Sequence, residues 1–150
     1  GGLISAQWKH SVMVLPYLLP SAVIVLMYSR VLNVMQLREE HAKQLGVNVE
    51  RAKLLLIVAA SLATAAAVAF TGPIGFIGLI APHTVRLLWG ADYRSLLPMA
   101  AVLGAAFLIL ADLVARTVVS PSELPVGVVT AFFGGPFFLF LLRYRRRVVM

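Results

Sequence analysis

Five long apolar segments, separated by shorter polar stretches, dominate the pattern of the chain. Their approximate bounds are residues 11–29, 54–71, 74–89, 95–115 and 126–142. Apolar runs of about 20 residues are typical of helices that cross a bilayer. The pattern therefore predicts an all-α fold, a polytopic membrane helix bundle with five transmembrane segments, in which residues 1–150 form a single transmembrane region.

Glycine and proline residues interrupt three of these segments. Pro16 and Pro20 should bend the first segment or delay its start, because proline lacks a backbone donor and clashes with the preceding turn. We expect the third segment to be interrupted, and the fifth to be broken near its middle. The residues assigned to helix breaks and close packing are Gly72, Pro73, Gly75, Gly78, Pro82, Gly134, Gly135 and Pro136. These glycines do not form a P-loop, and their spacing favours close packing and a tight re-entry between two spans.

A polar connector at residues 37–53 separates the first two apolar segments. Its charged residues are Arg38, Glu39, Glu40, Lys43, Glu50, Arg51 and Lys53. Every fourth residue from Leu37 to Leu45 would share one face of a short helix, and Gly46 is placed to end that helix with a positive φ. Asn48 would then be the N-cap of a second helix that enters the membrane. A solvated loop that only links two spans fits the charges equally well.

The charge pattern predicts a topology. The chain is 61% hydrophobic and 13% charged, whereas soluble domains are about a quarter charged. If the connector is cytoplasmic and the five spans alternate, eleven of the 13 Lys and Arg residues lie on the cytoplasmic side, leaving Lys9 and Arg116 outside. This asymmetry predicts an external N-terminus and a cytoplasmic C-terminus. The basic tail at 143–147 would then lie against the headgroups of membrane lipids. We therefore favour lipid over nucleic acid as the partner of the basic residues that give the chain its net charge of +7.

Candidate catalytic and metal-binding chemistry is sparse. The chain has no cysteine, which excludes disulfides and thiolate metal sites. His83 stands alone in the third segment, where a hydrogen-bonded structural role is commoner than metal ligation. Asp112 is followed one turn later by Arg116, so an i,i+4 ion pair is the simplest explanation. No acid lies near the centre of a span and no nucleophile–base set is present, so we predict no proton relay, no catalytic residue, no metal and no cofactor.

Four stretches resemble, in order, the permease subunits of bacterial ABC importers for iron-siderophores, haem and vitamin B12. They are HAKQLGVNVERAK at 41–53, GPIGFIGLIAPHTVRLLWGADYRSLLP at 72–98, GAAFLILADLVAR at 104–116 and ELPVGVVTAFFGGPFFLFLL at 123–142. The resemblance covers nearly the whole chain and is densest from Gly72 to Pro136. Motifs this long and in this order are far more specific than a single glycine pattern.

The resemblance implies an assembly of several subunits. Permeases of this family pair as a dimer around a central path, with an ATP-binding subunit on the cytoplasmic side and a substrate-binding protein outside. The residues that it assigns to ATPase coupling are Glu39, Ala42, Leu45 and Gly46. It assigns docking of the binding protein to Arg116, which Asp112 would hold in place. The implied protein is a non-enzymatic permease for a metal chelate, in the plasma membrane of a bacterium or archaeon.

Family members have about twice as many spans as this chain, which resembles spans six to ten. We therefore expect a fragment or a processed piece, and the absence of an initiator Met at Gly1 favours the same view. Two other functions stay open at this point. One is a secondary transporter or channel subunit, which would work without an ATPase. The other is a structural membrane fragment with no role in transport.

Overall fold

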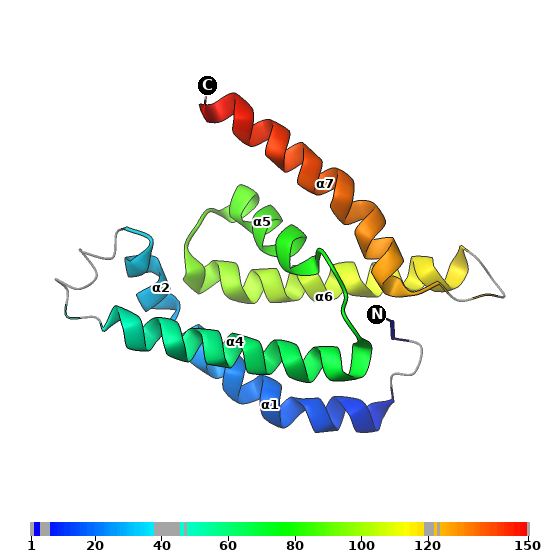
Figure 1. Ribbon diagram of the computed structural model, residues 1–150, viewed down its shortest axis with the longest axis horizontal. Helices are drawn as coiled ribbons and strands as arrows, with labels where there is room; N and C mark the ends of the chain where they lie inside the picture. Colours follow the sequence, from blue (N-terminus) through cyan, green and yellow to red (C-terminus); the bar gives the residue numbers. More distant parts are fainter. Residues whose placement is uncertain are drawn as a thin grey trace.

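The computed structural model describes residues 2–3, 7–37, 46, 48–118, 122 and 124–149, with side chains described up to residue 144. All regular structure in these residues is helical, as predicted (Figure 1). The helices are α1 Trp8–Met27, α2 Ser29–Met35, α4 Val49–Thr71, α5 Ile77–Trp89, α6 Tyr93–Thr117 and α7 Val126–Val149.

Four of the five predicted segments form helices that are long and apolar enough to cross a membrane. These are α1, α4, α6 and the part of α7 up to Tyr144. The third segment forms α5, which has 13 residues. At a rise of 1.5 Å per residue, α5 is about 20 Å long, shorter than the roughly 30 Å of the hydrocarbon core. The helix alone therefore does not span a bilayer.

The helices pack as two groups. Helix α1 lies against α4 in one group, and α5, α6 and α7 pack together in the other (Figure 1). In the described part of the chain, the main packing between the groups runs through α2 and α6. Small residues allow the close contacts, since Ala59 of α4 and Gly104, Ala111 and Ala115 of α6 are all buried.

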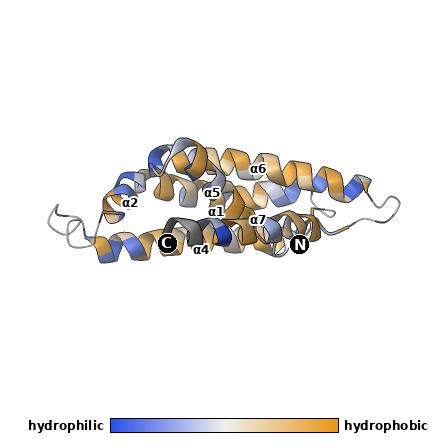
Figure 2. Ribbon diagram, turned by 90° about the horizontal axis from the view of Figure 1, so that it is seen from above, coloured by the Kyte–Doolittle hydropathy of each residue, from blue (hydrophilic) through white to orange (hydrophobic). Residues whose placement is uncertain are grey.

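The outer surface of the helices is mostly apolar. Figure 2 shows hydrophobic residues along the length of the helices and hydrophilic residues mainly near their ends. Large side chains such as Val102, Ile109 and Phe132 are 68–74% exposed in this chain. Large exposed apolar surfaces mark contact with lipid or with another protein. The arrangement supports the predicted membrane helix bundle.

The predicted helix breaks at Pro82 and at Gly134 to Pro136 are wrong. Helix α5 continues through Gly78 and Pro82, and α7 continues through all three residues of its glycine–proline motif. The start of α1 is not delayed either, since it begins at Trp8, before both of its prolines. A proline removes one backbone hydrogen bond, whereas a full break in an apolar segment leaves several polar groups unpaired where no water reaches them. The continuous helix is therefore the better solution.

Candidate functional site

The end of the connector forms the predicted turn and cap. Gly46 has a φ of 78°, the left-handed conformation predicted for it. The backbone N–H of Arg51 donates to Asn48 Oδ1 at 3.1 Å, so Asn48 caps α4 as expected. The predicted first connector helix, with the coupling residues Glu39, Ala42 and Leu45, lies outside the described residues.

The predicted ion pair on α6 is present. Arg116 Nε donates to Asp112 Oδ2 at 2.8 Å, one helical turn away. The Arg116 side chain is 47% exposed, so it remains accessible while Asp112 holds it. The pair lies in the last two turns of α6, at the end that is far from α2 and near the start of α7 (Figure 1).

A non-helical segment joins α4 to α5, where a tight re-entry was predicted. Gly72 ends α4 with a φ of 68° and donates its N–H to Val68 O at 2.8 Å. Phe76 precedes α5 with a φ of 68° and is the one non-glycine residue with positive φ in the described part of the chain. A bulky residue in this conformation is strained, and such strain persists only where the surroundings impose it.

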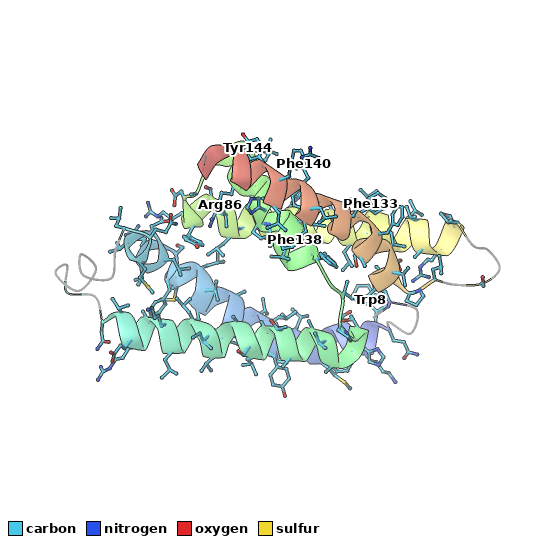
Figure 3. The ribbon with its side chains drawn as sticks, turned by 45° about the horizontal axis from the view of Figure 1, so that its top comes forward. Trp8, Arg86, Phe133, Phe138, Phe140 and Tyr144 are labelled. Atoms are coloured by element: carbon cyan, nitrogen blue, oxygen red, sulfur yellow. The ribbon has the colours of Figure 1, made fainter. Side chains whose placement is uncertain are left out.

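The surroundings of Phe76 include the glycine pair of α7. A Cβ atom added at Gly134 would overlap Phe76, with its Cδ1 only 2.7 Å away, whereas one added at Gly135 would meet nothing within 4 Å. Gly134 therefore permits a close approach of Phe76, at the start of α5, to α7. Beside this contact lies a cavity of about 290 Å³ between the two helices. Figure 3 labels two of its lining residues, Arg86 of α5 and Phe138 of α7.

A polar cluster, which we call the clamp, joins α2 to the turn between α5 and α6. Asn33 Nδ2 donates to Asp92 Oδ1 at 2.6 Å, and Asn33 Oδ1 accepts the backbone N–H of Tyr93 at 2.8 Å. Gln36 Nε2 donates to the carbonyl oxygen of Ala91 at 3.0 Å. Three hydrogen bonds thus join α2 and its C-cap Gln36 to the residues that lead from α5 into α6.

Asp92 also caps α6, because its Oδ1 accepts the backbone N–H of Arg94 at 3.0 Å. This bond, and then the one from Asn33, lowers the pKa of Asp92 below its usual value of 3.8. The carboxylate therefore stays charged at neutral pH, and its contribution to stability would fade only as the pH falls below 3.8. The sequence reasoning missed the clamp, although an aspartate just before a helical segment is a recognisable cap signal.

A larger groove separates the two helix groups. It has a volume of about 770 Å³ and is lined mainly by apolar residues of α4, α5 and α6, including Ala63, Ala67, Ala101 and Gly104. In the residues that the structure describes, no group of three His, Asp or Glu side chains is placed to hold a metal ion. The apolar lining of the groove suits packing against lipid or another protein segment.

The profile of the FecCD transport family matches residues 1–144. The chain belongs to the FecCD transport family. Its fold agrees with this membership, because it superimposes on a solved inward-facing conformation of a transporter assigned to the metal-chelate type of ABC transporter. The TM-score is 0.86 at 36% sequence identity, and the match covers 96% of this chain and 46% of that one.

Curated relatives of this FecCD chain are ABC transporter permeases from bacteria and archaea. The hemin transport system permease protein HmuU of Yersinia pestis is 47% identical over 97% of this chain and 44% of its own length. The cobalamin import system permease protein BtuC of Halobacterium salinarum is 50% identical over 97% of this chain and 39% of its own length. An uncharacterized permease protein, YvrB of Bacillus subtilis, is 46% identical over 97% of this chain and 42% of its own length. The chain therefore spans less than half the length of the relatives it matches.

Proposed function

We propose that the chain is the C-terminal half of an ABC importer permease that takes up an iron-siderophore or a related metal chelate such as haem or vitamin B12. The observation that carries the proposal is the family match over residues 1–144, together with identities of 47% and 50% to a hemin and a cobalamin permease. In this proposal, a separate subunit hydrolyses ATP. The names of the two relatives indicate different substrates, hemin and cobalamin. The proposal therefore names a class of substrate, the metal chelates, and not a single compound.

The proposed topology has five crossings, equivalent to spans six to ten of a complete permease. Residues 72–76 and α5 together make the third crossing. The four residues before Phe76 can add at most about 14 Å to the roughly 20 Å of α5, so together they can reach across a core of roughly 30 Å. Figure 1 supports this path, because α5 runs from the middle of the molecule toward the end where α6 begins. With five crossings, the distribution of Lys and Arg orients the N-terminus outside and the C-terminus in the cytoplasm.

The proposed partners follow from this orientation. The connector, with Glu39, Ala42, Leu45 and Gly46, would contact the ATP-binding subunit, and a second permease subunit would complete the path. The exposed Arg116 at the external end would contact an acidic residue of the substrate-binding protein. The positive φ of Gly46 and the Asn48 cap support the first role, because a turn followed by a capped helix is the arrangement expected at the end of the connector.

The experiment reconstitutes the full-length permease with its ATP-binding subunit and binding protein in proteoliposomes. Uptake of haem, vitamin B12 and a ferric hydroxamate siderophore is measured with ATP and with a non-hydrolysable analogue. We expect uptake of at least one chelate, and only with hydrolysable ATP. Uptake driven by an ion gradient without the ATPase would instead support a secondary transporter. Assembly without any transport would support a structural role.

A further inference from the structure

We propose that the clamp is a mechanical link that transmits movement of the connector to α5 during transport. In this view Asn33, Gln36 and Asp92 are positioning residues, which contact neither the ATP-binding subunit nor the chelate. The inference rests on the proposed function, because it needs a partner that moves the connector.

The clamp lies where the two helix groups make their main packing contact in the described residues. The packing between α2 and α6 coincides with its three hydrogen bonds. Away from this end, the groups are separated by the groove of about 770 Å³. A displacement of α2 would therefore pass to the α5–α6 turn through the clamp and the α2–α6 contact beside it.

The hydrogen-bond chemistry fixes the orientation of every group in the clamp. The backbone N–H of Tyr93 can only donate, so it must face the amide oxygen of Asn33. The amide nitrogen of Asn33 then faces Asp92, whose ionised carboxylate can only accept. Charge-assisted bonds of this kind are stronger than neutral ones. The link is therefore directional.

The position of the clamp along the chain suits a transmitting role. Gln36 directly follows α2 and lies next to the start of the connector. On the other side, Gly90 separates Ala91 from the last turn of α5. The far end of α5 is held by the contact between Phe76 and Gly134. Movement at one end of α5 against this fixed end would tilt the helix and change the cavity that it shares with α7.

The test exchanges the amide of Asn33 and the carboxylate of Asp92. Asn33→Asp places two carboxylates together and should lower chelate uptake per ATP hydrolysed by about tenfold, a coupling loss of ordinary size. The double variant Asn33→Asp/Asp92→Asn restores one acid and one amide, and both backbone bonds can still form, so it should recover most of the ratio. Gln36→Ala, which removes one exposed bond, should give a smaller loss. Ser95→Ala is the matched control, because its hydroxyl bonds only to the carbonyl of Asp92 within the same turn.

A second readout does not depend on the substrate. Spin labels at exposed positions of α5 (Leu87) and α7 (Phe140) report the distance between these helices in the assembled transporter. Adding ATP and vanadate should change this distance in the parent protein and in the double variant. In Asn33→Asp the same addition should leave the distance unchanged. Normal coupling and normal movement in Asn33→Asp would overturn the proposal, as would a double variant no better than the single one. Failure of the parent protein to take up any chelate would instead count against the proposed function.

Discussion

At the scale of single residues, the contact between Phe76 and Gly134 explains two unusual features together. Phe76 adopts a left-handed conformation that costs a bulky residue free energy, and Gly134 lacks the Cβ that would collide with it. The two residues lie on either side of the α5–α7 contact. The strain at Phe76 is therefore sustained by packing against a neighbouring helix.

This contact gives a prediction for Gly134→Ala. The added methyl group overlaps Phe76, so we expect a loss of about 1–3 kcal/mol of stability, typical of overpacking. Thermal unfolding of the purified permease should show a lower midpoint. Gly135→Ala is the control, because its methyl group meets nothing within 4 Å of this chain and alanine favours the helix. Recovery of the unfolding midpoint in the double variant Phe76→Gly/Gly134→Ala would confirm that the two residues are in contact. Equal losses of stability in Gly134→Ala and Gly135→Ala would show that other contacts dominate.

Arg116 gives a second prediction at this scale. Arg116→Glu should weaken docking of the binding protein by roughly tenfold, because it sets like charges against an acidic partner and beside Asp112. The loss should be larger at low salt than at high salt, since ions screen an exposed pair. Binding is measured by titrating the binding protein onto the permease in nanodiscs. Arg116→Lys should retain most of the affinity. A cysteine at this position that reacts only from the cytoplasmic side would contradict both the role and the topology.

At the scale of elements, the connector and the cap of α4 form one junction. Gly46 has a φ of 78°, and two residues later Asn48 begins the cap of α4. A β-branched side chain at Gly46 costs about 1–2 kcal/mol in this conformation. We therefore expect Gly46→Val to reduce copurification of the ATP-binding subunit or to uncouple hydrolysis from uptake. Gly46→Asn is the control, because asparagine tolerates the left-handed region. Unchanged coupling in Gly46→Val would remove the junction from the mechanism.

The elements that the sequence predicted well are those set by local chemistry. The Asn48 cap and the Asp112–Arg116 pair depend on residues three or four apart, and the structure contains both. The long spans follow from hydropathy alone. The break in α7 was predicted wrongly, because the backbone preference of a glycine–proline motif yields to the need to keep backbone groups paired in an apolar setting.

The clamp shows the limit of such reasoning. Asn33 and Asp92 are 59 residues apart, and no local pattern indicates that their side chains meet. The capping role of Asp92 could be predicted from its place before α6, but its second bond depends on how α2 folds back onto the other helix group. Long-range polar pairs of this kind need the tertiary structure.

At the scale of the whole molecule, much apolar surface is left without a protein partner. The groove between the helix groups and the exposed side chains of α4, α6 and α7 face no other segment of the described chain. In the proposed topology, the non-helical backbone at residues 72–76 also lies at membrane depth, where such backbone must be covered by protein or line a wet cavity. The chain matches less than half of each relative's length, so we infer that the other half supplies much of this cover.

The half-permease proposal leads to the last prediction. The 150-residue chain expressed alone should self-associate in detergent and should not transport, even with the ATP-binding subunit and the binding protein present. Helix faces made of small residues promote association between membrane helices, so faces without their own partners should bind helices of other copies of the chain. Coexpression of the preceding half as a separate chain should shift the protein to a defined size in gel filtration and restore part of the uptake. A version of that half with its spans scrambled is the control. ATP-driven uptake by vesicles that contain only this chain and the two partner proteins would contradict the half-permease proposal, because the path would then be complete without the missing helices.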